Sequence, residues 1–177
     1  ISECRNAENT VLYIYIDGTK AGASEETINN INEVKKIVVQ KKWCGEVHIH
    51  IAEKNKGLFK SIVEGVTETV NKYGKVIVIE DDVLVFPGFL NYMNNALDLY
   101  EHTPEVMHIS AFTRAEFAAV PLPDTTFFYN HTTCWGWATW KRAWDKFTPD
   151  PLAIKKACLK KGNIDYLNMD GTTDFFW

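Results

Sequence analysis

Three adjacent carboxylates, Glu80, Asp81 and Asp82, are the side chains of this sequence best suited to chemistry. This acidic triplet directly follows four β-branched residues at 76–79, a run typical of a strand buried on both faces of a sheet. Crowded like charges need compensation, and hard cations such as Mn²⁺ or Mg²⁺ bind carboxylate oxygens. Since such cations also neutralise diphosphates, the pattern predicts a metal and nucleotide site at the carboxyl edge of a sheet.

A structural interpretation of the same acids is that they cap the helix that follows. However, Phe86 and Pro87 come before that helix, and proline favours the first helical position. The cap is therefore expected at Phe86, beyond the acidic triplet, and the binding interpretation is favoured.

Asp17 is a second acid at the end of a strand, because it follows the β-rich run Val11–Ile16. In a parallel sheet the carboxyl ends of both strands lie on one side, so Asp17 and the acidic triplet are expected to line one cleft. Considered alone, Asp17 and Gly18 form an ordinary Asp-Gly turn.

An aromatic segment supplies the remaining candidates, Trp135, Gly136 and Trp137, with Trp140 close behind. Such clusters more often form core than ligand platforms. Yet indole faces stack on sugar rings, and a glycine between two tryptophans lets the backbone approach a ligand closely. Both interpretations stay open from the residues alone.

Other kinds of site are disfavoured. His48 and His50 share one face of a predicted strand, but no third zinc ligand is near in sequence, and His131 with Cys134 is an equally weak pair. The sequence has no G-x-G-x-x-G, no P-loop motif and no G-x-S-x-G, which argues against a dinucleotide site, a P-loop and an α/β-hydrolase.

Strands and helices alternate along the chain up to residue 112, which predicts an α/β fold with a mostly parallel central sheet and helices on both faces. A Ser24 cap is expected to begin the first helix, with Glu25 and Glu26 in its first turn. The predicted strands are 11–16, 47–51, 76–79, 106–112 and a short 127–129. The first predicted helix follows Ser24 and has its apolar stripe at 28–38, a second helix has its stripe at 59–70, and further helices are predicted at 88–101, 141–147 and 151–161.

The composition is that of an ordinary globular protein. The 177 residues are 46% apolar and 24% charged, and the net charge of −4 gives no electrostatic footprint for nucleic acid. Four widely spaced cysteines, no signal peptide and no membrane span favour a reduced, cytoplasmic chain. The length predicts a single domain, and both of its ends are expected to be truncated. Within that domain, residues 1–112 are expected to form one half and residues 113–177 the other.

Taken together, these motifs resemble the N-acetylglucosaminyltransferase I type of GT-A glycosyltransferase, including its bacterial sugar transferase relatives. The resemblance in residues 76–112 rests on Val-Ile-Val-Ile-Glu-Asp-Asp, then Phe-Pro-Gly-Phe-Leu, then a strand ending Ile-Ser-Ala-Phe. Residues 127–147, with Cys-Trp-Gly-Trp and Lys-Arg-Ala-Trp-Asp, are similar to the family segment that closes over donor and acceptor. The likeness covers about residues 11–147, and the family's first strand has no counterpart.

The resemblance implies a metal-dependent glycosyltransferase that moves a sugar from a UDP-sugar to a carbohydrate hydroxyl with inversion, in the cytoplasm or at the inner face of a membrane. The acidic triplet matches the family's variant of the DXD motif, so Asp82 would bind Mn²⁺ (or Mg²⁺) while Glu80 and Asp81 face the donor sugar and ribose. Asp17 would contact the uracil, and Asp174 is the nearest match to the catalytic base, with Asp170 or a residue beyond Trp177 as alternatives.

Two other functions remain open. A sugar nucleotidyltransferase also uses acids on an α/β sheet, although its Gly-rich, basic phosphate loop is not visible here. The aromatic segment and the missing first strand also permit a degenerate transferase or a carbohydrate-binding module without catalysis. The donor sugar, the acceptor and the oligomeric state do not follow from the sequence.

Overall fold

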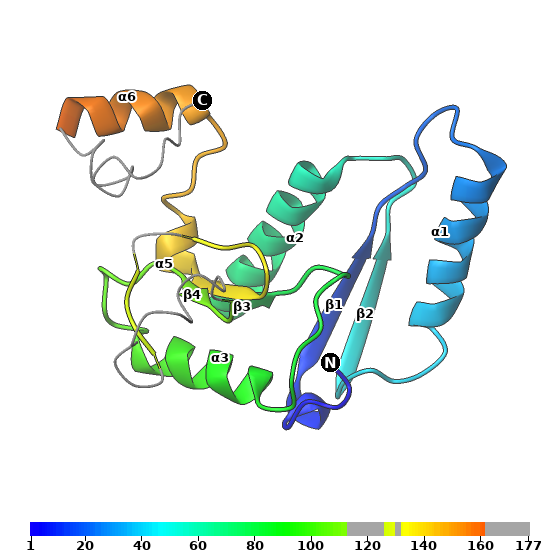
Figure 1. Cartoon of the computed structure of the whole chain (residues 1–177), viewed down its shortest axis with the longest axis horizontal. Helices are drawn as coiled ribbons and strands as arrows, with labels where there is room; N and C mark the ends of the chain where they lie inside the picture. Colours follow the sequence, from blue (N-terminus) through cyan, green and yellow to red (C-terminus); the bar gives the residue numbers. More distant parts are fainter. Residues whose placement is uncertain (113–125, 130–131, 162–177) are drawn as a thin grey trace, which may run out of the picture.

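The computed structural model describes residues 1–112, 126–129 and 132–161 of the chain (Figure 1). The fold is mixed α/β, as predicted, and begins with a short 3₁₀ turn at Ala7–Asn9. The elements that follow are β1 (Val11–Ile16), α1 (Glu25–Val38), β2 (Glu46–Ile51), α2 (Leu58–Tyr73), β3 (Lys75–Val78), α3 (Phe89–Leu99), β4 (Ile109–Ser110), β5 (Trp137–Trp140), α5 (Lys141–Trp144) and α6 (Pro151–Lys161).

Local signals place the helix ends. The Ser24 hydroxyl accepts a hydrogen bond from the Thr27 amide at 3.2 Å, which confirms the predicted cap of α1. Gly74 ends α2 in the left-handed conformation (φ 79°), and its amide donates to the Val70 carbonyl, so the chain turns directly into β3. The strand Val11–Ile16 and the helix Pro151–Lys161 have the predicted bounds.

The sheet differs from the mostly parallel one that the sequence predicts. The described strands form a parallel pair, β1 with β2, and a separate sheet of order β3-β5-β4 in which both pairings are antiparallel. The difference comes from β5, which lies between β3 and β4 and runs opposite to both. Its sequence, Trp-Ala-Thr-Trp, is short and follows a glycine, and it was not predicted as a strand.

Helices cover both faces of the three-stranded sheet. Ala138 and Trp140 of β5 lie on the core face with Phe89, Met93 and Leu97 of α3, all almost fully buried, and the Trp140 indole N–H donates to the Leu97 carbonyl at 3.0 Å. On the opposite face Trp144 of α5 donates its indole N–H to the Thr67 hydroxyl of α2 at 2.8 Å. Burying side chains of this size stabilises the fold by roughly 1.5–3 kcal/mol each.

One hydrophobic core extends across both sheets. Leu12 of β1 and Val47 of β2 pack against the same buried cluster as Ile77 of β3 and Val85 of the loop after it. Residues 76–79 are only half-buried, although full burial on both faces was expected. The predicted strand at 106–112 is reduced to Ile109–Ser110, and residues 127–129 pair with no strand of the described chain.

None of the helices in the described ranges is long and apolar enough to cross a membrane.

Candidate functional site

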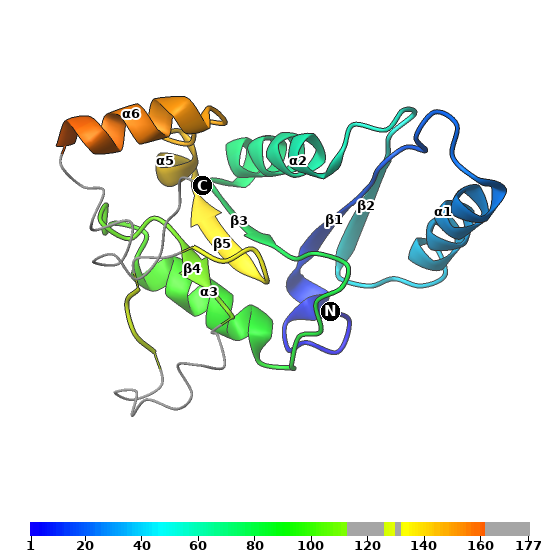
Figure 2. The same cartoon turned by 45° about the horizontal axis from the view of Figure 1, so that its top comes forward.

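The acidic triplet and the aromatic segment adjoin paired strand ends at one end of the three-stranded sheet. Val78, the last residue of β3, pairs with Trp137, the first residue of β5. The chain leaves β3 and enters β5 at this end of the sheet (Figure 2). The acidic triplet begins two residues after β3, and Gly136 directly precedes β5. Ser110 of β4 also pairs with Trp137, and the Ala111 amide donates to the Gly136 carbonyl at 2.9 Å. Three chain segments distant in sequence therefore converge at this end of the sheet.

The carboxylates of the acidic triplet have no partner among the residues that the structure describes. Glu80 is half-buried, whereas Asp81 and Asp82 are exposed. Within the described ranges, none of the three side chains takes part in a hydrogen bond or ion pair. They do not cap α3 either, because that helix begins at Phe89 with Gly88 as its cap, which is two residues beyond the predicted position. These oxygens remain available to a ligand.

The oxygen atoms of the acidic triplet suit a metal ion that is shared with a bound phosphate, and do not suit a metal ion held by protein side chains alone. Across residues 1–112, 126–129 and 132–161, no three His, Cys, Asp or Glu side chains converge into a group that could hold a metal ion. A cage built from protein ligands alone is therefore not formed by these residues. Mg²⁺, however, is usually bound through one or two carboxylates plus the phosphates of its substrate, and an exposed, unpaired Asp82 fits that arrangement.

Asp17 has the opposite surroundings, because both of its oxygens are occupied. Oδ1 accepts hydrogen bonds from the amides of Gly18 (2.8 Å) and Lys56 (2.7 Å), and Oδ2 accepts from the amide of Gly57 (2.8 Å) and from Nδ2 of Asn55 (2.9 Å). The Lys56 amide is the largest cause of a lowered Asp17 pKa. Asp17 thus ties the end of β1 to the loop that begins α2.

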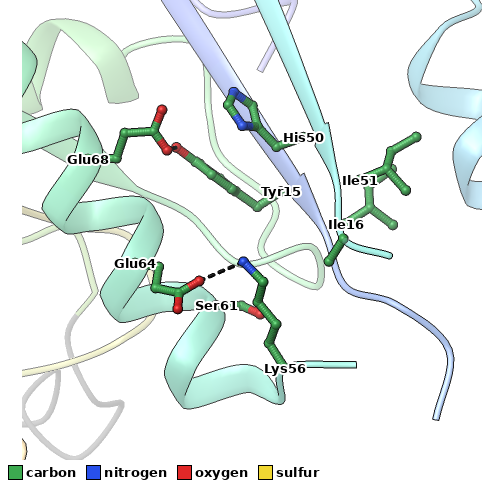
Figure 3. A pocket seen from close by; sticks show the side chains of 9 residues that line it. Tyr15, Ile16, His50, Ile51, Lys56, Ser61, Glu64 and Glu68 are labelled. Atoms are coloured by element: carbon green, nitrogen blue, oxygen red, sulfur yellow. Dashed lines mark hydrogen bonds and ion pairs between the residues drawn. The ribbon is translucent and has the colours of Figure 1, made fainter. Parts of the chain in front are cut away.

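The predicted common cleft is not formed by one parallel sheet, because Asp17 follows β1 and the acidic triplet follows β3, which lie in different sheets. A hollow of about 230 Å³ does lie on the Asp17 side, between β1, β2 and α2 (Figure 3). It is lined by Tyr15, Ile16, His50, Ile51, Ala52, Lys56, Ser61, Glu64 and Glu68 and includes no member of the acidic triplet. Its charged groups are paired internally: Lys56 with Glu64 at 2.6 Å, and the Tyr15 hydroxyl with Glu68 at 3.1 Å.

His48 and His50 lie on the face of the parallel sheet that α2 covers. Their rings pack against Tyr13 and Tyr15 at centroid distances of 4.6 and 4.8 Å. His48 also pairs with Glu46 at 2.7 Å. This packing supports the sequence interpretation of the histidines as a half-exposed strand face.

The aromatic segment divides into an exposed and a packed part. Trp135 is 47% exposed and makes an edge-to-face contact with Phe112 at 4.6 Å between ring centroids. Trp137 is half-buried, stacks on the His108 ring at 5.4 Å and packs against the tilted Trp144 ring at 6.1 Å between centroids. Of the two tryptophans, Trp135 is the one with a ring surface to offer a ligand.

The backbone conformation and the close packing at position 136 both favour glycine. It is buried with φ 74°, and a Cβ placed on it would lie 3.2 Å from the Phe89 ring of α3. The sequence suggested that the backbone at Gly136 approaches a ligand closely, and in the structure it approaches Phe89 of α3.

His108 is a half-buried titratable residue with a fully buried Nε2, and the sequence did not single it out. Burial lowers its pKa to about 4, and its Nε2 has no hydrogen-bond partner among the described residues. Ser110 of β4, two residues further on, bonds the Thr133 hydroxyl at 2.5 Å. A neutral imidazole just before β4 and a hydroxyl pair at its end therefore lie close together in the sequence of this segment. The only feature of the sequence that pointed to His108 and Ser110 was the predicted strand at 106–112, which contains both.

Asp174 and Asp170 lie outside the described residues. Comparison of this chain with known protein families, curated proteins and solved structures finds no match.

Proposed function

We propose that this chain is a metal-dependent glycosyltransferase domain of the GT-A type, transferring a sugar from a UDP-sugar to a carbohydrate hydroxyl with inversion. The observation that carries the proposal is the pairing of Val78 with Trp137, which brings the acidic triplet and the aromatic segment to one sheet edge. A sugar nucleotide needs both chemistries side by side: oxygen ligands for its charged diphosphate and an apolar ring surface for its sugar.

Each group at this edge is assigned one task. Asp82, exposed and unpaired, would hold Mn²⁺ or Mg²⁺, and the cation supplies charge stabilisation to the departing UDP when it is bound. Glu80 and Asp81 accept hydrogen bonds from hydroxyl groups of the donor sugar and ribose. Trp135 offers its exposed ring to a sugar face, while Trp137 and Gly136 fix the backbone that carries it.

Two further tasks fall to residues away from this edge. Transfer with inversion requires a carboxylate to take the proton of the acceptor hydroxyl, a contribution typically worth ~10²–10⁴-fold in rate. We assign this role to Asp174, with Asp170 as the alternative. Asp17, whose four hydrogen bonds leave no obvious acceptor free, is assigned to folding rather than to uracil recognition.

A second candidate function is carbohydrate binding without transfer. It is favoured by one observation, the exposed ring of Trp135 beside Phe112, which serves a sugar whether or not a nucleotide is attached. It differs from the transferase in needing neither the metal nor the acidic triplet.

The test is a thermal-shift panel of UDP, UDP-sugars, UTP and free oligosaccharides, with and without Mn²⁺, followed by a UDP-release assay with acceptor sugars. The proposal predicts stabilisation by UDP and UDP-sugars only with metal, about 2.7 kcal/mol at 100 times the dissociation constant. Asp82→Asn should lower this shift by at least about half, because a tenfold weaker affinity leaves ~1.4 kcal/mol at the same ligand concentration. Glu105→Gln is the matched control, because Glu105 is an equally exposed acid between α3 and β4, before that strand begins.

The alternatives give different results in the same panel. Metal-independent stabilisation by free oligosaccharides, with no UDP release, would indicate the binding module. Pyrophosphate release from UTP and a sugar-1-phosphate would instead indicate the nucleotidyltransferase.

A further inference from the structure

The turn that carries Trp135 is closed by its own backbone. The Gly136 amide donates to the Cys134 carbonyl at 3.1 Å, so Trp135 is the central residue of a three-residue turn. Its side chain is 47% exposed, and its indole N–H has no hydrogen-bond partner in the part of the chain that the structure describes. This turn therefore offers an aromatic ring and a hydrogen-bond donor to solvent.

Residues 110–112, which end β4 and follow it, hold this turn at three points. The three contacts are the hydroxyl pair of Ser110 and Thr133 (2.5 Å), the Ala111 amide with the Gly136 carbonyl (2.9 Å), and the edge-to-face rings of Phe112 and Trp135 (4.6 Å between centroids). One contact lies before the exposed ring in sequence, one lies after it, and one is made by the ring itself. The backbone of the turn is therefore fixed on both sides of Trp135.

The Ser110 hydroxyl uses all of its hydrogen-bonding capacity here. Its Oγ donates to the Phe112 carbonyl at 2.9 Å and accepts from the Phe112 amide at 3.2 Å. A serine hydroxyl has one hydrogen and two acceptor lone pairs, so the Thr133 hydroxyl is the donor in the remaining bond. We call the side chains of Ser110 and Thr133 the hydroxyl clasp. The clasp joins the residue two positions before Trp135 to the residue whose ring Trp135 contacts.

Ser110 is the fixed half of the hydroxyl clasp. Its backbone pairs with Trp137 of β5, and its carbonyl accepts from the Tyr92 hydroxyl of α3 at 3.1 Å. Tyr92 itself packs against the buried core. Thr133 lies outside the helices and strands, so the clasp ties an irregular segment to a residue that is held by both the sheet and the core.

We propose that Ser110 and Thr133 are positioning residues, which hold the Trp135 ring in the one orientation that stacks on the apolar face of a pyranose ring. A ring that is fixed before binding loses little conformational freedom when the saccharide binds, and the affinity is higher for that reason. The inference rests on the sugar binding of the proposed function and needs neither the metal ion nor the transfer step. A clasp that served folding alone would change stability without changing the orientation of the ring.

The first measurement is fluorine NMR of the whole chain labelled with fluorotryptophan, with the Trp135 signal identified by its absence in Trp135→Phe. Thr133→Val removes the hydroxyl and keeps the branched shape of the side chain. We expect its Trp135 signal to move toward the shift of free fluorotryptophan and to narrow, because the ring becomes mobile. Thr133→Ser keeps a hydroxyl and should keep the signal of the unsubstituted chain.

The second measurement is calorimetric titration with two probes that have flat apolar faces, cellotriose and chitotriose, and separately with UDP and Mn²⁺. Thr133→Val should weaken trisaccharide binding about fivefold, the ratio expected for one neutral hydrogen bond, and Thr133→Ser should restore it. Binding of UDP with Mn²⁺ should not change, because none of the clasp hydrogen bonds in the described chain involves the acidic triplet.

Thr139→Val is the matched control. The Thr139 hydroxyl is buried on β5 and donates to the Met107 carbonyl at 2.9 Å, so this change also removes a hydroxyl bond from the same sheet. It should lower the free energy of unfolding but leave the Trp135 signal and the trisaccharide affinity unchanged. Ser110→Ala removes the other hydroxyl of the clasp and should repeat both effects of Thr133→Val.

Four results would overturn the inference: an unchanged Trp135 signal in both clasp variants, equal trisaccharide affinity of those variants and the unsubstituted chain, the same losses in Thr139→Val, or no binding of either trisaccharide by the unsubstituted chain. Trisaccharide binding that depends on the clasp, in a protein that binds no UDP, would support the inference and contradict the proposed transfer.

Discussion

Asp17 and the acidic triplet both follow a β-branched strand, yet their carboxylates have opposite surroundings. Asp17 accepts four hydrogen bonds from Gly18 and from the loop before α2. Asp82, after β3, is exposed and free of partners in the described chain. A carboxylate whose acceptor sites are filled by backbone amides stabilises the fold, whereas one left open can bind something else. An acid that follows a β-branched strand can therefore either stabilise the fold or remain available to a ligand, and this chain has an example of each.

Removing the Asp17 carboxylate should produce the largest effect on stability. Asp17→Ala leaves the amides of Lys56 and Gly57 without their acceptor and is expected to lower the free energy of unfolding by ~2–3 kcal/mol. Chemical denaturation monitored by tryptophan fluorescence measures this loss. A change as small as that of Asp82→Ala would break the distinction between the two acids.

The free energy of unfolding should depend on pH through His108 and Asp17, but in different pH ranges. His108 beside β4 has a pKa lowered to about 4 by burial, so the unfolded chain binds a proton there before the folded chain does. Stability should therefore fall as the pH drops from about 6.5 toward 4, by up to ~1.4 kcal/mol per pH unit. The lowered pKa of Asp17 has its effect only as the pH falls below its ordinary value of 3.8.

His108→Phe should flatten the pH dependence of unfolding between 6.5 and 4, as measured by denaturation at a series of pH values. His102→Gln, an exposed histidine, should leave it unchanged. A curve that falls equally in His108→Phe would remove His108 from this role.

A pair of glycine variants tests how tightly the candidate edge is packed. Gly136→Ala meets both a left-handed backbone and the Phe89 ring at 3.2 Å, whereas Gly22→Ala meets a left-handed backbone (φ 74°) with nothing nearby. The backbone cost is ~1–2 kcal/mol in both, so Gly136→Ala should be the more destabilising by about another kcal/mol. Equal thermal unfolding of the two variants would mean that the Phe89 contact is unimportant.

The smallest expected effect on stability belongs to Asp82. Because its side chain contacts no partner among the described residues, Asp82→Asn should change the free energy of unfolding by less than about 0.5 kcal/mol. Denaturation beside the Glu105→Gln control measures this. A large loss would show that Asp82 supports the fold and would weaken its assignment to a ligand.

The sequence predicted what local patterns determine. The strand Val11–Ile16, the Ser24 cap and the helix Pro151–Lys161 follow from β-branched runs, capping chemistry and proline placement, and the structure confirms all three. The mixed α/β class was predicted for the same reason. The position of the acidic triplet just past a strand end was also predictable, since the strand signal before it is strong.

What the sequence missed depends on partners far along the chain. Trp137–Trp140 contains strand-favouring Trp and Thr, but the run is only four residues long, and its place between β3 and β4 and its antiparallel direction depend on pairing with those distant strands. Apart from Gly18, the hydrogen-bond partners of Asp17 lie 38 to 40 residues away in sequence. No local motif could therefore show whether Asp17 stabilises the fold or binds a ligand.

The most direct test of the account is calorimetric titration of UDP with Mn²⁺ into the protein, its Asp82→Asn variant and its Asp17→Asn variant, each below its melting temperature. We predict that Asp82→Asn keeps its stability but binds UDP at least about tenfold more weakly, ~1.4 kcal/mol, while Asp17→Asn loses stability and keeps its affinity. Unchanged UDP binding in Asp82→Asn, or loss of binding in a folded Asp17→Asn, would contradict the assignment of the open carboxylates to the ligand.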